Sequence, residues 1–158
     1  LFLLPFLCYT KNSFDKWRKK MPNWCSNRVE VYGDDEEIKV WKDLVESKES
    51  KFDFNKIIPM PKELEDTTKG SNHVVSEELI EKYGYDNWYD WSVNSWGTKW
   101  SIHADEIEVE DSGDQIVYHF STAWSPPQGI YHELRGKFPD LSLTWFYDEP
   151  GMQFAGYL

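Results

Sequence analysis

Four short segments in which hydrophobic and polar residues alternate constrain the fold of this chain more than any other feature. They span residues 28–32, 106–110, 115–122 and 141–147. A period of two is typical of strands that bury only one face. Four half-buried strands predict an antiparallel sheet that has helices on one side.

Two segments with helical periodicity lie between these strands. In the first, Asp34 and Glu37 resemble a capping box, and apolar residues then repeat at helical spacing to about Ser47. In the second, Ser125 is expected to cap a helix that has proline in its first turn and ends after Phe138. Each segment predicts one amphipathic helix.

The order of the predicted elements is β-α-β-β-α-β, with a tryptophan-rich insert at residues 48–100 between the first helix and the second strand. This is the order of a ferredoxin-like α+β sandwich, in which two helices cover one face of an antiparallel sheet. The expected strand order is 4-1-3-2, so the first and third strands are central. Residues 152–158 can pair back as an edge strand. We therefore predict a single ferredoxin-like domain over residues 21–158.

The insert is less regular than the rest of the chain. Proline disfavours helix in the residue before it, which favours extended chain around the prolines of the insert. The predicted segments are extended chain at 51–54 and 57–61, a polar loop at 62–72, and a short helix at 76–83 with Leu79 and Ile80 turned inward.

Residues 1–20 are expected to lie outside this fold. The apolar run at 1–8 is too short to span a bilayer, and basic residues follow it instead of preceding it as they do in a signal peptide. Met21 comes directly afterwards and is interpreted as the natural start. Residues 1–20 are then a non-native or upstream leader. A clipped secretion signal is the alternative.

The acidic composition limits the classes of function. The chain has 17 Lys and Arg against 28 Asp and Glu, a net charge of −11. The leader holds five basic residues and one Asp, so residues 21–158 carry −15. Direct nucleic-acid binding is not expected, because it needs a basic surface that neutralises phosphates. Cys25 is the only cysteine after the leader, which favours a reducing, cytoplasmic compartment.

Three motifs resemble one known family. They read MPNWCSNRV at 21–29, NSWGTKW at 94–100 and FSTAWSPP at 120–127. In this order they are similar to the YubB-like proteins, an uncharacterised family with a ferredoxin-like domain found mainly in phages, plasmids and related bacterial genomes. The resemblance covers residues 21–158 and implies a ferredoxin-like fold and a mobile-element context. It supplies no catalytic residue.

The sheet face turned away from the helices is the first candidate binding surface. Strand parity places Arg28, Glu30, Tyr32 and His119 on it, beside an acidic edge at 106–110. RNA-recognition domains use the same face, but their Lys/Arg-Gly-aromatic signature does not occur here. Two alternatives are open. The insert folds over this face and fills it with aromatic side chains, or the face is a platform for a partner or ligand.

The aromatic density of residues 85–100 marks a second candidate region. One interpretation is that these side chains fill the core of an insert that is short of aliphatic residues. The other is a carbohydrate site, in which flat rings stack on sugars while Asp86 and Asp90 accept hydrogen bonds from hydroxyls. The candidate binding residues here are Trp88, Trp91, Trp96, Trp100 and, further along the chain, Trp124.

Neither a metal site nor a catalytic constellation is predicted. Cys25 is interpreted as a small buried residue, because no motif supports a nucleophile pair with His119. The chain has no glycine-rich phosphate loop and no nucleophile elbow, so we expect no catalytic residue and no cofactor. No two histidines have the sequence spacing that is typical of a zinc site. The four histidines are His73, His103, His119 and His132.

The leading functional hypothesis is an accessory protein of a phage- or plasmid-type mobile element. It is expected to be non-catalytic and to bind an unknown protein partner, with no role at a membrane. One alternative is an acidic DNA mimic that acts against a host nuclease. Another is a small enzyme or glycan-binding module that uses the tryptophan-rich insert. Burial of the insert's tryptophans separates the last alternative from the others.

Overall fold

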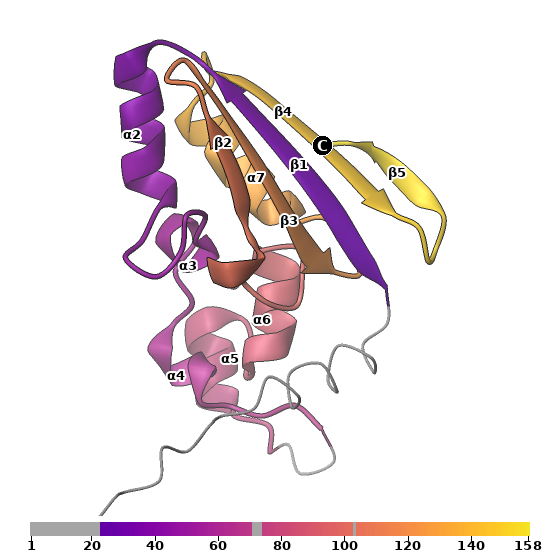
Figure 1. The fold of residues 1–158 in the computed structure, drawn as a ribbon. Coiled ribbons are helices and arrows are strands. Elements are labelled where there is room, and N and C mark those ends of the chain that lie inside the picture. The colour runs from indigo at the N-terminus through magenta and orange to yellow at the C-terminus, as the bar shows by residue number, and fades with distance from the viewer. Residues whose placement is uncertain (1–22, 71–73, 103) are drawn as a thin grey trace, which may run out of the picture.

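The strand β1 (Trp24–Tyr32) lies inside a single antiparallel sheet, between two strands from the C-terminal half of the chain (Figure 1). The computed structural model describes residues 23–70, 74–102 and 104–158, so the predicted leader lies outside the described residues. The strand order is β2-β3-β1-β4-β5. The remaining strands are β2 (Glu108–Asp111), β3 (Gln115–Ala123), β4 (Ser142–Glu149) and β5 (Phe154–Tyr157).

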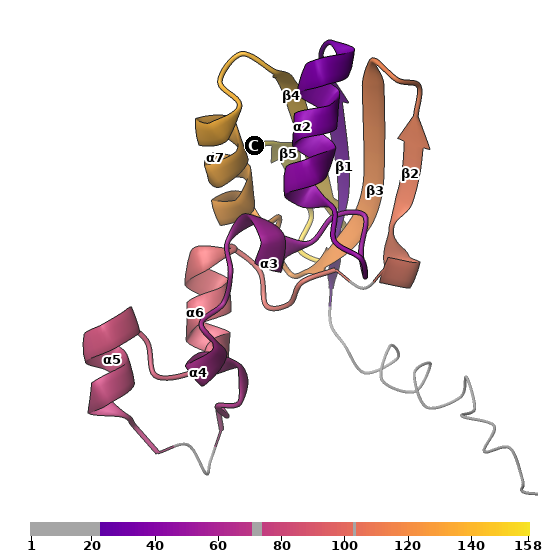
Figure 2. The ribbon, with the colours of Figure 1, turned by 90° about the vertical axis from the view of Figure 1, so that its left-hand side faces the viewer.

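The first four strands follow the order that the fold class predicts, and β5 adds an edge strand beside β4. Figure 2 shows α2 (Asp35–Val45) and α7 (Gln128–Lys137) on the same side of this sheet. We call the opposite side the open face. The other helical segments are α3 (Phe54–Ile57), α4 (Lys62–Glu65), α5 (Glu77–Tyr83), α6 (Trp88–Ser95) and the 3-10 turn η1 (Ala104–Glu106).

Helix α2 begins as the sequence predicts. The Asp34 side chain accepts hydrogen bonds from the amides of Glu36 and Glu37 at 3.0 and 2.9 Å. The Glu37 side chain accepts one from the Asp34 amide at 3.2 Å, which completes the capping box. The apolar face of the helix then buries Ile38 and Trp41 against the sheet.

The start of α7 differs from the prediction. The helix begins at Gln128 after Pro127, and no side chain caps it. The predicted cap, Ser125, donates its hydroxyl hydrogen bond to the carbonyl of Gly97 at 2.7 Å instead. A tertiary contact has thus taken the hydroxyl that would otherwise cap the helix. The predicted apolar face of the helix is confirmed, because Ile130 and Leu134 are fully buried.

The insert also differs in detail from the prediction. Between the two segments predicted as extended chain, α3 makes one helical turn that also takes their end residues Phe54 and Ile57. Asp53 caps this turn, because its side chain accepts from the Asn55 amide at 2.9 Å. In the predicted loop 62–72, α4 makes another turn. The predicted short helix is confirmed as α5 with Ser76 as its cap, but Ile80 is 42 % exposed rather than turned inward.

Aromatic side chains from the insert fill the core between the sheet and its helices. The ring centroid of Phe52 lies 5.0 Å from that of Tyr118 and 5.8 Å from that of Trp145. Phe54 lies 6.3 Å from Phe120 in an edge-to-face arrangement. All five rings are buried. Each such burial contributes about 1.5–3 kcal/mol, which explains why the insert turns inward here.

The interpretation that the insert folds over the open face is therefore wrong. On this face the Arg28 side chain is 52 % exposed and Tyr32 is 56 % exposed. Figure 2 shows the helices of the insert on the helix side of the sheet and below it. The insert aromatics Phe52, Phe54, Trp91 and Trp96 are buried in the core instead of covering the open face.

The second and third motifs interlock where α6 ends and α7 begins. The Gly129 amide donates to the Trp96 carbonyl at 3.1 Å. A Cβ on Gly129 would lie 1.9 Å from the Ser95 carbonyl oxygen. A Cβ on Gly97 would lie 2.6 Å from the Gln128 amide nitrogen, and Gly97 also has a φ of 90°. Only glycine lets the two backbones approach this closely.

We predict that Gly129→Ala destabilises the fold by about 1–3 kcal/mol, because the backbone must move to admit a methyl group. Gly136→Ala in the same helix is the matched control, since nothing lies within 4 Å of a Cβ there. It is expected to stabilise by about 0.4–1 kcal/mol. Urea unfolding of the two variants measures both effects. Equal stability of the two variants would contradict the close contact.

Candidate functional site

A row of side chains crosses all five strands on the open face. The pairing register sets Glu108 opposite His119, His119 opposite Arg28, Arg28 opposite Phe146, and Phe146 opposite Tyr157. Directly opposed residues on one sheet face have Cβ atoms about 4.5–5.5 Å apart. We call these five residues the cross-strand row. It brings together two of the predicted site residues, Arg28 and His119.

The side chains of the cross-strand row change from aromatic at the β5 edge to acidic at the β2 edge. At the β5 edge the rings of Phe146 and Tyr157 meet edge-to-face at 5.3 Å, and Tyr157 is 70 % exposed. In the centre Arg28 forms a salt bridge with Glu30, the next residue on that face of β1. At the β2 edge the row ends in the exposed carboxylate of Glu108. The predicted residue Tyr32 lies on the same face, beyond Glu30.

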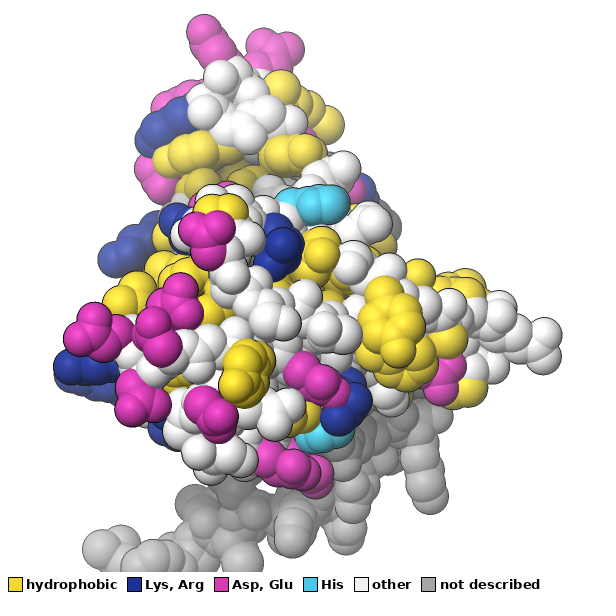
Figure 3. Space-filling view, turned by 90° about the horizontal axis from the view of Figure 1, so that it is seen from above, with side chains coloured by type: hydrophobic (Ala, Val, Ile, Leu, Met, Phe, Trp, Pro, Cys, Tyr) yellow, Lys and Arg dark blue, Asp and Glu magenta, His cyan; other side chains and the backbone are white. Residues whose placement is uncertain are grey.

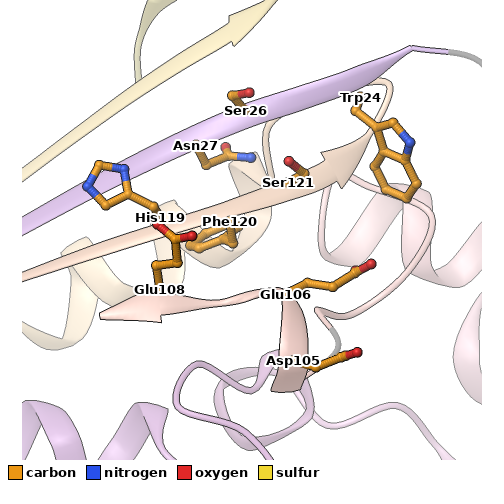
Figure 4. A pocket seen from close by; sticks show the side chains of 9 residues that line it. All are labelled: Trp24, Ser26, Asn27, Asp105, Glu106, Glu108, His119, Phe120 and Ser121. Atoms are coloured by element: carbon orange, nitrogen blue, oxygen red, sulfur yellow. The ribbon is translucent and has the colours of Figure 1, made fainter. Parts of the chain in front are cut away.

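A hollow of about 700 Å³ lies beside this row, over β1, β3 and the start of β2. Figure 4 shows Trp24 at one end of it and His119 at the other. Ser26 and Ser121, which pair across β1 and β3, lie between them. The lining residues are Trp24, Ser26, Asn27, Asp105, Glu106, Glu108, His119, Phe120 and Ser121.

The lining of the hollow is strongly acidic on one side. Asp105 and Glu106 come from η1, and Glu108 comes from β2 (Figure 4). His119 is the one lining residue whose side chain can carry a positive charge. The indole of Trp24 supplies a flat face at the end. Carboxylates beside an indole suit the ammonium or guanidinium group of a cationic ligand.

Two predicted site residues, Trp91 and Trp96, belong to the core. They are 7 % and 3 % exposed, and their rings meet edge-to-face at 5.3 Å. The Trp96 indole donates a hydrogen bond to the Ile58 carbonyl at 2.9 Å. They therefore offer no surface on which a sugar could stack.

The other predicted tryptophans, Trp88, Trp100 and Trp124, are half-buried. The acidic residues that were expected to bind hydroxyls are already engaged. Asp90 accepts a hydrogen bond from the Asn87 side chain and forms a salt bridge with Lys69, and these contacts lower the pKa of Asp90. Asp86 accepts from the same amide at 2.8 Å. The carbohydrate site is not assembled as the sequence suggested.

The two histidines that the structure describes, His119 and His132, do not come together. In the part of the chain that the structure describes, no group of three or more His, Cys, Asp or Glu residues could hold a metal ion. His119 lies on β3 and His132 on α7, on different sides of the sheet. His73 and His103 lie outside the described residues.

Cys25 is a core residue, as expected. It has no exposed surface, and burial raises the pKa of its thiol to about 11, with the nearby Glu149 carboxylate adding to the effect. It sits next to a buried polar group, because the Asn27 side chain donates to the Cys25 carbonyl at 2.9 Å and to Thr122 Oγ at 2.8 Å. Asn27 also accepts from the Trp145 indole at 3.0 Å, which ties three strands together.

Strand parity placed Glu106, Glu108, His119 and Ser121 on the open face, and all four line the hollow. The same alternation could have added Trp24 and Ser26, because they precede Arg28 on that face of β1. Asp105 was not predictable in this way. The alternating segment was expected to start at residue 106, whereas η1 occupies that position and places Asp105 and Glu106 along one side of the hollow.

Comparisons with known proteins agree with this fold. A family model described as a ferredoxin-like domain in Api92-like protein matches residues 95–158. The crystal structure of protein api92 from Yersinia pseudotuberculosis is similar, with a TM-score of 0.53 and 12 % identity. The alignment covers 85 % of this chain and 93 % of that chain. At this identity the likeness shows the fold alone, a ferredoxin-like α+β domain.

None of the curated proteins compared with the chain matches it. Among the described residues, no helix combines the length and the hydropathy that crossing a membrane requires. The assignment of the candidate site therefore depends on the structure of this chain alone.

We predict that Cys25 is inert in the folded protein. In a Cys8→Ser background, a disulfide reagent at about pH 8 should react about 100-fold more slowly than in denaturant, because the pKa shift from 9.0 to about 11 removes thiolate. Below pH 9 the Cys25 thiol is protonated in both the folded and the unfolded chain, so its contribution to stability is fully present. As the pH rises from 9 through about 11, only the unfolded chain ionises readily, and this stability is lost. Equal reaction rates in the two states would show that Cys25 is accessible.

Proposed function

We propose that this chain is a non-catalytic module that binds another protein through the open face of its sheet. The partner presents a basic side chain, which enters the hollow. One observation carries the proposal. The hollow has Asp105, Glu106 and Glu108 along one side and the Trp24 indole at its end, so its chemistry favours a cation.

The two sides of the open face have complementary roles in this proposal. A lysine or arginine of the partner pairs with Glu108 at the His119 end of the hollow, and the charge attraction also speeds the encounter. The Trp24 indole packs against another side chain of the partner at the opposite end. The rings of Phe146 and Tyr157 then supply apolar contact area at the opposite edge. Aromatic residues are enriched in protein interfaces because they bury much area with few rotatable bonds. Arg28 lies between the two and sets the register of the partner.

We further propose that the protein is a phage- or plasmid-type accessory protein that acts in the cytoplasm. The resemblance of its three motifs to the YubB-like proteins supports this context. The single cysteine of residues 21–158 is consistent with a reducing compartment. These statements concern the setting of the module, and they are independent of the chemistry of the hollow.

The DNA-mimic hypothesis makes a different demand on the surface. A mimic needs carboxylates in a regular array that resembles phosphates. On the end of the molecule seen in Figure 3, acidic side chains are interspersed with basic and apolar ones. The open face likewise combines acidic residues with Arg28 and His119. We therefore favour a basic protein segment in the hollow over competition for a whole DNA groove.

The test is a titration of the full, isotope-labelled chain with a peptide of alternating Arg and Ser, followed by NMR. The amide signals of Glu108, His119 and Ser121 should shift saturably, and a matched peptide of alternating Glu and Ser should have no effect. We predict that Glu108→Gln with Glu110→Gln weakens binding about three- to tenfold. Glu110 is the next exposed residue on the same face of β2, so each of the two carboxylates loses an ion pair with an arginine of the peptide.

The double variant Glu78→Gln with Glu81→Gln is the matched control. It changes the net charge equally but alters exposed residues of α5. Its affinity should stay at the level of the unmodified chain. Equal weakening by both double variants would mean that the peptide responds only to overall charge. Shifts that are absent from the open face would also overturn the proposal.

A further inference from the structure

Three aromatic rings surround the ammonium group of Lys99. Its Nζ lies 4.1 Å from the ring centroid of Trp100, 5.2 Å from that of Trp124 and 5.7 Å from that of Tyr89. Tyr89 belongs to α6, while Trp124 directly follows β3. We call these four residues the Lys99 cluster. All four are half-buried, so the cluster is partly dehydrated and still reachable from solvent.

Lys99 differs from the other lysines that lie over rings. Lys69 lies 5.3 Å from the Tyr89 centroid but pairs with Asp90. Lys82 lies 4.8 Å from the Tyr83 centroid but pairs with Glu63 at 2.8 Å. Among the described residues no carboxylate forms a salt bridge with Lys99, although the chain has 28 acidic residues. Burial lowers the pKa of Lys99, because it penalises the charged ammonium form.

The cluster is held in place by the two interlocked motifs. The Thr98 hydroxyl donates to the Ala123 carbonyl at 3.0 Å, which fixes the residue before Lys99 beside the residue before Trp124. Trp124 has a φ of 69°, which is unusual for a bulky side chain. Its amide donates to the Asn23 carbonyl at 3.1 Å. The first motif thus also helps to hold the ring against Lys99.

We propose that the Lys99 cluster is a second binding site, which takes a small organic anion with a carboxylate or phosphate attached to a flat ring. The anion pairs with the Lys99 ammonium, which lacks a counter-charge. The flat ring packs on the accessible parts of Trp100 and Trp124. This preference for an anion is the reverse of the preference of the hollow, so the two sites take different ligands. The inference therefore does not depend on the proposed partner of the open face.

The test uses the indole N–H signals of Trp100 and Trp124 in the full chain, assigned with the Trp100→Phe and Trp124→Phe variants. The probes are benzoate, phenyl phosphate, benzyl alcohol and inorganic phosphate. Benzoate or phenyl phosphate should shift these signals saturably, and benzyl alcohol should not. The stronger of the two anions identifies the carboxylate or the phosphate as the natural group. Inorganic phosphate should bind more weakly, because it has no ring.

Lys99→Met should weaken binding of the aromatic anion about tenfold or more, whereas Lys99→Arg should retain it because the charge remains. Lys82→Met is the matched control, because Lys82 also lies over a ring but already has Glu63 as its partner. It should leave the affinity unchanged. Undiminished binding to Lys99→Met, equal binding of benzyl alcohol or inorganic phosphate, or no saturable shift would each overturn the proposal.

Discussion

The close approach of two backbones at Gly97 and Gly129 is the contact on which much of the molecule depends. Because neither position has room for a Cβ, the end of α6 lies directly against the start of α7. This contact holds Trp96 in the core and leaves Lys99 and Trp124 together at the surface. The insert is anchored to the sandwich on the helix side, and the open face stays accessible.

Elements stabilised by contacts that are local in sequence were the predictable ones. The capping box of Asp34 and Glu37 lies within four residues, and strand alternation needs only the strand itself. Contacts between distant residues could not be predicted in this way. No local pattern shows that Phe52 enters the core, or that the hydroxyl of Ser125 bonds Gly97 instead of capping a helix. Long-range packing overrode the local preference at both places.

The same distinction between local and long-range contacts applies to the candidate site. Parity alone placed Arg28 and His119 on one face of the sheet. The register between strands, which a single sequence does not specify, decides that Glu108 stands opposite His119. The turn η1 then adds Asp105. Tertiary packing likewise decides which tryptophans are buried. Trp91 lies in the core, whereas the aromatic neighbours of Lys99 lie at the surface.

The central position of β1 has a consequence for synthesis of the protein. Its partners β3 and β4 begin at Gln115 and Ser142, so β1 emerges from the ribosome long before either strand exists. Val29 and Val31 are fully buried in the finished sheet, and they face water throughout that interval. Pairing over such a sequence separation is slow, and an apolar strand that waits is prone to wrong associations. β1 is therefore the strand of the sheet that spends the longest time without a pairing partner during synthesis.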